Sequence, residues 1–343
     1  MHMNERILRG AFFVANFYVR RKKQMMDYES FKERVMKEFL DYLPERYAEC
    51  ELELRKVPKV NTCLTGVVIK PKEKCSFCGP TFYMERMYEQ YKNCESFEKV
   101  MANQAIYLEE SLKYLPKDIL ELDLTALKDK IVFQVVNTRE NQEMIALCPH
   151  RKLMDLTVVY RAITNVDEEG VSGFLITNDI ASAEDLTEKA LYAMAKKNTK
   201  KLFPFKSERI EETMMRMMKR WGAKEDDIDQ SFPYINDVPE NERVYVISNK
   251  YEFFGANALL YKDVIGNVAK SIGTDCYILP SSVHDLVVLS TDIFDESTKL
   301  INLVRETNSE HVRISDRLSD SIYLYSLDNG KINQISAPLE EVS

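Results

Sequence analysis

Residues 156–177 read LTVVYRAITNVDEEGVSGFLIT, and this stretch decides the fold class. Residues 156–163 and 173–177 are rich in β-branched and aromatic side chains, which predicts two strands. The polar segment Asp167-Glu168-Glu169-Gly170 between them predicts a turn. Strands joined this closely pair antiparallel, because a parallel pair needs a long crossover. The stretch therefore predicts an α+β protein and not a doubly wound parallel sheet.

The elements on either side predict two mixed or antiparallel βαββα modules. In the first, a strand at 131–136 and a helix at 140–147 precede the two strands, and a helix follows with Ser182 as its N-cap and Asn198 at its end. The second contains strands at 244–248, 276–279 and 286–290 and helices at 256–272 and 296–307. A last strand, 322–327, enters Asp328-Asn329-Gly330, which is a strong hairpin signal.

The N-terminal part predicts a helix–β-hairpin–helix unit. A helix runs from Asp27 towards Pro44, strands cover 51–57 and 63–70, and 84–115 is mostly helical with a break near 93–96. The expected divisions are a basic extension at 1–25, this unit at 26–120, the modules at 121–205 and 244–343, and a helical, acidic linker at 206–243. Residues 175–180 and 288–293 are alike, which suggests an internal duplication of the module.

Composition excludes several classes of protein. Of 343 residues, 45% are hydrophobic and 30% charged, so the chain is globular and not a disordered or collagen-like protein. The formal net charge of −8 disfavours direct binding to nucleic acid, which needs clustered basic side chains. No window reaches the ~18 apolar residues of a membrane helix. Residues 1–24 hold six basic residues and one acid, and Met25 or Met26 is an alternative start.

Seven cysteines at irregular spacing favour reduced thiols and a cytoplasmic location. Cys75 and Cys78 form a C-x-x-C pair flanked by Cys63 and Cys94, a weak candidate for a zinc site. The paired knuckle spacing of zinc sites is absent, so we expect incidental thiols and no metal. Cys148 lies near His150, but residues two apart rarely form a nucleophile–base pair. We expect His150 to begin a strand and bond the backbone, with Arg151 pairing Asp155.

The segment Pro280–Asp285 brings Ser281, Ser282 and His284 together between two apolar strands. These three residues, with His150, are the candidate catalytic side chains, and no other catalytic residue can be named. The alternative is a structural turn whose hydroxyls satisfy backbone groups. Residues of a catalytic triad usually come from distant segments, which favours the structural turn.

Four methionines and Trp221 mark one further segment, a helix predicted at 207–221 that ends at Gly222. A methionine-rich face serves either as core or as an adaptable binding surface, and core is the commoner use. Phosphate-binding loops, H-E-x-x-H and EF-hand motifs are absent, so we expect no cofactor.

Three stretches carry a resemblance to a known family. They are Pro149-His150-Arg151 with residues 155–160, the run from Ala195 to Pro204, and residues 245–256 with the Pro280–Asp285 segment. Together they resemble an uncharacterised family of Firmicute proteins, frequent in gut Clostridia and known as a domain of unknown function. The Pro-Ser-Ser-Val-His segment is also similar to a second uncharacterised, Bacillus-type family. Neither resemblance implies a reaction.

Three hypotheses about function follow. The first is a non-enzymatic cytoplasmic interaction or regulatory protein that binds a protein partner. The second is a hydrolase-like enzyme built on Ser281, Ser282 and His284. The third is a mobile-element factor that inhibits a host defence protein, with Glu225, Asp226, Asp227 and Asp229 of the acidic loop 224–230 facing a basic groove. The oligomeric state is left open.

Overall fold

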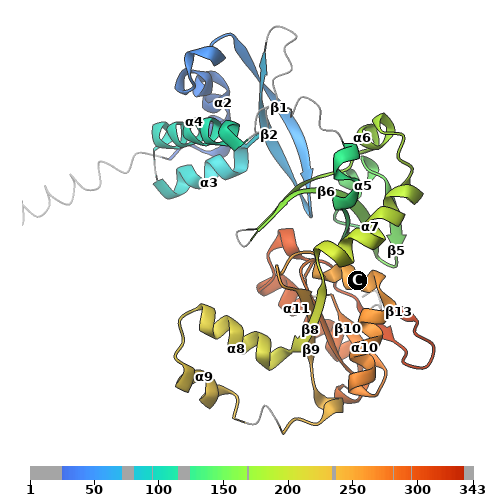
Figure 1. Cartoon of the computed structure of the whole chain (residues 1–343). Coiled ribbons are helices and arrows are strands. Elements are labelled where there is room, and N and C mark those ends of the chain that lie inside the picture. The colour runs from blue at the N-terminus through green and yellow to red at the C-terminus, as the bar shows by residue number, and fades with distance from the viewer. Residues whose placement is uncertain are drawn as a thin grey trace, which may run out of the picture. The chain divides into compact units, whose positions relative to one another are not determined.

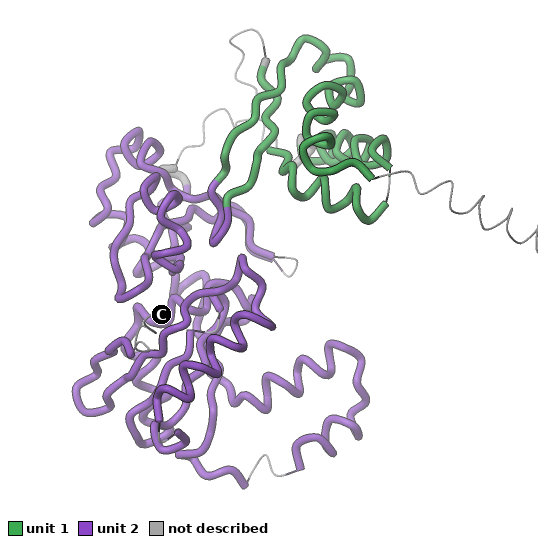
Figure 2. The backbone as a smooth tube through the Cα atoms, turned by 180° about the vertical axis from the view of Figure 1, so that it is seen from behind, with its two compact units in different colours: residues 1–57, 63–122 green, residues 58–62, 123–343 purple. Residues whose placement is uncertain are grey.

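The computed structural model describes residues 25–71, 81–94, 96–114, 124–167, 170–233, 237–280, 282–294 and 296–335. The predicted basic extension at 1–25 lies outside them, apart from Met25. The chain divides into two compact units (Figure 2): residues 1–57 with 63–122 form unit 1, and residues 58–62 with 123–343 form unit 2. The described residues combine helices with antiparallel sheets (Figure 1), which confirms the α+β class.

Unit 1 is a helical layer against a three-stranded sheet. Its elements are α2 (Tyr28–Glu38), the 3₁₀ turns η1 (Phe39–Tyr42) and η2 (Glu45–Tyr47), β1 (Cys50–Lys59), β2 (Thr62–Pro71), β3 (Phe82–Tyr83), α3 (Met84–Cys94) and α4 (Phe97–Tyr114). The sheet order is β1-β2-β3. The ends of β1 and β2 that meet at the hairpin, residues 58–59 and 62, belong to unit 2. The helical break predicted at 93–96 is confirmed, and Phe31, Val35 and Phe39 are fully buried at helical spacing.

Unit 2 begins with a sheet centred on one long strand. Its elements are η4 (Leu124–Lys130), β4 (Ile131–Asn137), α5 (Gln142–Ala146), β5 (His150–Leu153), β6 (Leu156–Val166) and β7 (Val171–Leu175). β6 pairs β4 along one edge, and β5 and then β7 along the other, all antiparallel. The short turn between β6 and β7 forces this pairing, as residues 156–177 predicted.

Helices α6 (Asn178–Ala183) and α7 (Glu188–Leu202) follow, and here two predicted boundaries are wrong. The N-cap of α7 is Thr187, which accepts from the backbone N–H of Ala190, and not Ser182, which lies inside α6. Asn198 does not end α7. Its buried amide donates to the carbonyls of Lys128 and Ile131, so it serves tertiary packing.

A second, six-stranded sheet completes unit 2. Its elements are β8 (Phe205–Arg209), α8 (Ile210–Arg220), α9 (Glu225–Ser231), η5 (Glu240–Glu242), β9 (Tyr245–Asn249), η6 (Gly255–Leu260), α10 (Lys262–Ile272), β10 (Cys276–Leu279), β11 (Leu286–Ser290), η7 (Thr291–Ile293), α11 (Ser297–Glu310), η8 (Ile314–Asp316), β12 (Ile322–Tyr325) and β13 (Ile332–Ile335). The sheet order is β13-β12-β10-β11-β9-β8. The predicted hairpin at 328–330 joins β12 to β13, with Gly330 at φ +64°.

One hydrophobic core serves both sheets of unit 2. It joins Phe133 and Val158 of the first sheet to Ile247, Ile278 and Tyr323 of the second, all fully buried. The two sheets differ in strand order. The three corresponding strands of the first module neighbour one another in chain order, β4-β6-β7, whereas those of the second lie in the order β9-β11-β10. Agreement between the modules is thus limited to element order along the chain, and the duplication stays a prediction.

The start of the predicted linker belongs to this second sheet. Residues 205–209 pair antiparallel with β9, so the helix predicted from 207 begins instead at Ile210.

Among the helices of the described residues, none combines the length and the apolar character that a membrane span requires.

Candidate functional site

In the predicted turn at 280–285, the hydroxyl of Ser282 and the carbonyl of His284 are hydrogen-bonded, while the buried Nδ1 of His284 has no hydrogen-bond partner among the described residues. The hydroxyl of Ser282 accepts from the backbone N–H of His284 at 3.0 Å. The carbonyl of His284 accepts from the hydroxyl of Ser248 at 2.7 Å and from the backbone N–H of Gly255 at 3.0 Å. These bonds are the ones expected of a structural turn. Ser281 lies outside the described residues.

The ring of His284 meets a carboxylate that the sequence did not single out. Nε2 of His284 lies 3.7 Å from Oδ1 of Asp316, and the ring packs edge-on against Phe253 with centroids 5.4 Å apart. A serine nucleophile would need its hydroxyl hydrogen-bonded to the imidazole. The hydroxyl of Ser282 accepts from the backbone N–H of His284, and no bond from it to the imidazole is seen among the described residues, so this geometry gives the hydrolase hypothesis no support.

His150 lies on β5 of the first sheet, whereas His284 lies in the turn between β10 and β11. His150 begins β5, and its Nδ1 lies 2.9 Å from the carbonyl of Cys148, as predicted for a strand-start residue that bonds backbone. The expected pairing of Arg151 with Asp155 is wrong. Arg151 forms a bidentate pair with Glu188, at 2.9 and 3.0 Å. Asp155 instead accepts from Ser319 and Tyr323, both far along the chain.

Cys63, Cys94, Cys148 and Cys276 are separate free thiols. Cys63 is exposed on β2, and Cys94 ends α3 with its thiol donating to the carbonyl of Ser96. Cys75 and Cys78 lie outside the described residues. Within the described ranges, no group of three or more His, Cys, Asp or Glu side chains is arranged to hold a metal ion. Burial raises the pKa of the Cys148 thiol to about 11 and that of Cys276 to about 12.

These environments predict the order of alkylation. The thiolate is the reactive form, so iodoacetamide at pH 8 should modify exposed Cys63 in the native protein and leave Cys148 and Cys276 unmodified. All three should react after unfolding in urea. Peptide mass spectrometry at increasing reaction times measures this order, and native Cys148 reacting as fast as Cys63 would contradict the described burial.

Helix α8 is held with its charged face against the sheet. Thr213 donates to Glu208 of β8 at 3.0 Å, and Arg216 pairs with both Glu208 and Glu252. Arg220 pairs with Glu252 at 3.0 Å. Burial alone would raise the pKa of Glu252, but hydrogen bonds from Arg220 and Arg216 lower it below its usual range. The carboxylate is therefore ionised at neutral pH, and these pairs anchor the helix.

The apolar face of α8 consequently points to solvent. Met214, Met217 and Trp221 are 47%, 37% and 75% exposed, and their spacing of three and four places them on one stripe. α8 contains no buried residue, so the interpretation of the methionines as core is wrong. We call this stripe of three residues the α8 face.

An acidic helix follows the α8 face directly. Gly222, at φ +85°, permits the turn after Trp221, and the backbone N–H of Ala223 closes it on the carbonyl of Met218. Glu225, Asp226, Asp227 and Asp229 of α9 are exposed, while Ile228 is fully buried. Both views show α8 and α9 projecting from the β8 end of the sheet (Figure 1, Figure 2).

Residues 28–327 match a family described as "Family of unknown function (DUF5688)". The chain belongs to DUF5688. The match begins one residue after Asp27, the N-cap of α2, and covers most of the chain. No curated protein and no solved structure matches the chain.

The DUF5688 region includes each candidate described above. The α8 face, the acidic helix α9 and the turn at 280–285 all lie within residues 28–327. Strand β13, at 332–335, lies beyond the matched residues. Fold-level membership alone assigns no function, so function is argued from these surfaces.

Proposed function

We propose that this DUF5688 protein is a non-enzymatic, cytoplasmic interaction protein whose partner docks on the α8 face. The observation that carries the proposal is the outward position of Met214, Met217 and Trp221 on a helix whose charged side is ion-paired to β8 and to the loop after β9. Apolar side chains grouped on the surface cost free energy in water, which a bound partner would recover. Cys63, Cys94, Cys148 and Cys276 are free thiols, which supports a reducing compartment.

The proposed occupant is a basic amphipathic helix of a partner protein. Methionine and tryptophan adapt to varied apolar side chains, as on surfaces that accept helices in a groove. Glu225 pairs with Lys219 of α8 at 2.8 Å. The exposed carboxylates of Asp226, Asp227 and Asp229 lie just beyond it and favour a partner carrying lysine or arginine beside its apolar stripe. The hypothesis of a mobile-element factor that inhibits a host defence protein is a special case of this proposal, in which the basic partner is that host protein.

Calorimetric titration with a synthetic amphipathic helix of leucine and lysine tests the proposal on the full chain. We expect saturable one-to-one binding, and no binding of the matching leucine–glutamate helix. Replacing Met214 and Met217 together with glutamine should weaken binding about tenfold, or ~1.4 kcal/mol, through lost apolar contact. Glutamine keeps the helix propensity of methionine, so α8 should stay folded.

The matched control is Leu303→Gln, which changes an exposed apolar residue (49% exposed) of α11. This variant should bind the basic helix as the parent does. Equal affinity of the parent and the double methionine variant would contradict the proposal. Two other results would also contradict it. One is a concentration-dependent dimer of the parent that is lost in the double methionine variant, and the other is selective adsorption of the parent to anionic lipid vesicles.

A further inference from the structure

A small pocket of about 260 Å³ opens on the surface of unit 1, where strand β3 and helices α3 and α4 meet. Its lining combines aromatic rings, carboxamides and one cation, and none of the described residues that line it is acidic. Drug-sized ligands occupy pockets of roughly 300–1,000 Å³, so this pocket suits a smaller molecule.

Helices α3 and α4 form the two long sides of the pocket. The short connection between them makes an antiparallel helical hairpin, and the two helices lie side by side in unit 1 (Figure 1). The amide of Gln104 donates to Oε1 of Gln90 at 2.9 Å, which fixes how the helices align. About one helical turn from this bond, roughly 5.4 Å along the axes, lie Arg86 on α3 and Tyr107 on α4. Arg86 and Tyr107 therefore border the same pocket from facing helices.

The cation of the pocket has no anionic partner among the described residues. Arg86 is exposed, and its guanidinium carbon lies 5.2 Å from the ring centroid of Tyr83. It forms no ion pair or hydrogen bond with a described residue. The flanking carboxylates are engaged elsewhere, Glu89 with Lys92 at 2.6 Å and Glu85 with groups of α2 and β2. The N–H donors of Arg86 are therefore available to a carboxylate, which a guanidinium can hold through two parallel hydrogen bonds.

Aromatic surface lies open beside this cation. Tyr107 is 52% exposed, and its ring meets that of buried Phe82 at 77° with centroids 6.2 Å apart. Phe82 thus supports the Tyr107 ring from within the core, and half of the Tyr107 side chain still faces water. An exposed aromatic surface costs free energy in water, which an aromatic ligand would recover by ring contact.

Carboxamides supply neutral donors and acceptors to the same pocket. After the bond between Gln90 and Gln104, the amide nitrogen of Gln90 and Oε1 of Gln104 have no described partner. Asn103 also lines the pocket and forms no hydrogen bond with a described residue. Such groups suit a hydroxyl, which both donates and accepts a hydrogen bond.

We propose that this pocket binds a small aromatic carboxylate of the hydroxybenzoate class. The carboxylate bonds the guanidinium of Arg86, and the ring packs against Tyr107. A hydroxyl on the far side of the ring reaches the carboxamides, which lie about one helical turn from Arg86. An inorganic anion would leave the tyrosine surface bare, and a neutral aromatic molecule would leave the guanidinium unpaired, whereas an aromatic carboxylate satisfies both.

Saturation-transfer NMR with the full chain tests the assignment, with 4-hydroxybenzoate as the probe. We expect saturable binding with a Kd of about 1 mM or tighter. Two analogues should each bind about tenfold more weakly or worse. They are 4-hydroxybenzamide, which lacks the anionic carboxylate, and trans-4-hydroxycyclohexanecarboxylate, which lacks the aromatic ring. The absence of 4-hydroxybenzoate binding, or equal binding of either analogue, would overturn the proposal.

Two variants and two controls locate the site. Arg86→Gln should weaken 4-hydroxybenzoate binding about tenfold, and Tyr107→Leu should weaken it several-fold, both with little change in melting temperature because the side chains are exposed. Arg139→Gln and Ile106→Gln change exposed side chains that do not line the pocket and should bind as the parent does. Binding unaffected by either pocket variant would contradict the site. The double methionine variant of the α8 face should keep 4-hydroxybenzoate binding, which separates this proposal from the docking proposal.

Discussion

Asn257→Ala is expected to lower the free energy of unfolding of unit 2 by about 4 kcal/mol. Asn257 lies on η6 and is 1% exposed. Its side chain hydrogen-bonds the backbone of β4 along the edge that does not pair with β6. Its amide donates to the carbonyl of Phe133 at 2.6 Å, and its Oδ1 accepts from the backbone N–H of Val135 at 3.1 Å. Alanine would leave two buried backbone groups unpaired, each costing about 1–3 kcal/mol.

Urea unfolding followed by circular dichroism measures this loss. The matched control is Asn267→Ala, at an exposed position of α10 whose side chain forms no described hydrogen bond. That control should change stability by less than about 0.5 kcal/mol. If the two variants unfold at the same urea concentration, Asn257 does not close the edge of β4 as described.

Gly255→Ala is the second substitution with a large expected effect, a loss of about 3 kcal/mol or more. A Cβ at this position would lie 2.1 Å from the carbonyl oxygen of His284 and 2.8 Å from Cα of Ser248. Both are backbone atoms, so no side-chain rotation relieves the clash. Relief requires separating the turn at 282–285 from the start of η6, where Gly255 donates to that same carbonyl.

Thermal unfolding of Gly255→Ala against Gly273→Ala separates the clash from a general effect of losing glycine. Gly273 ends α10 at φ +88°, and a methyl group added there would meet no described atom within 4 Å. Its replacement should cost only about 1 kcal/mol, from the left-handed backbone. A smaller loss for Gly255→Ala than for Gly273→Ala would show that the two segments do not approach as closely as described.

Local patterns were sufficient to predict most elements. The bounds of β10 and β11 agree with the predicted 276–279 and 286–290, because Gly273 and the polar segment 280–285 delimit short apolar runs. Where prediction failed, contacts between distant segments determined the structure. Ser182 and Thr187 are both plausible caps, and only packing selects Thr187. β8 is short and charged, so only its pairing with β9 identifies it as a strand.

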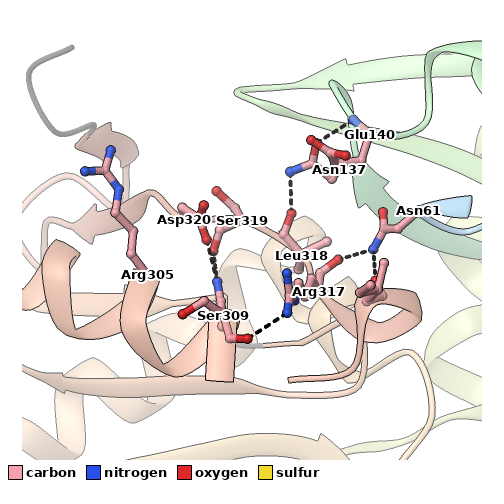
Figure 3. Close-up of a pocket in the computed structure, with 11 residues that line it drawn as sticks. Asn61, Asn137, Glu140, Arg305, Ser309, Arg317, Leu318, Ser319 and Asp320 are labelled. Atoms are coloured by element: carbon pink, nitrogen blue, oxygen red, sulfur yellow. Dashed lines mark hydrogen bonds between the residues drawn. The ribbon is translucent and has the colours of Figure 1, made fainter. Parts of the chain in front are cut away.

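The orientation of α8 could not be predicted from its own sequence. Periodicity groups Met214, Met217 and Trp221 on one face, but it does not say whether that face meets the core. The orientation depends on Glu208 and on Glu252, which lies 36 residues after Arg216. A polar cavity of about 230 Å³ (Figure 3) was missed for a similar reason, because its lining comes from three separate parts of the chain: Asn61, residues 137–140 and residues 305–320.

The turn at 280–285 shows which features of a candidate site can be predicted from the sequence. The interpretation of residues 280–285 as a structural turn rested on local chemistry, and the bond between Ser282 and the backbone of His284 agrees with it. The approach of Asp316 to His284 joins residues 32 apart and has no local signal. The assignment of Ser281, Ser282, His284 and His150 to catalysis stays untested.

Acrylamide quenching of Trp221 fluorescence tests the docking account most directly, because Trp221 is the sole tryptophan of the chain. At 75% exposure, its indole should be quenched in the free protein nearly as readily as a small tryptophan peptide. Saturating leucine–lysine amphipathic helix should reduce that quenching several-fold by covering the α8 face, while the leucine–glutamate helix should leave it unchanged. A tryptophan already shielded in the free protein, or one equally accessible with the basic helix bound, would contradict the account.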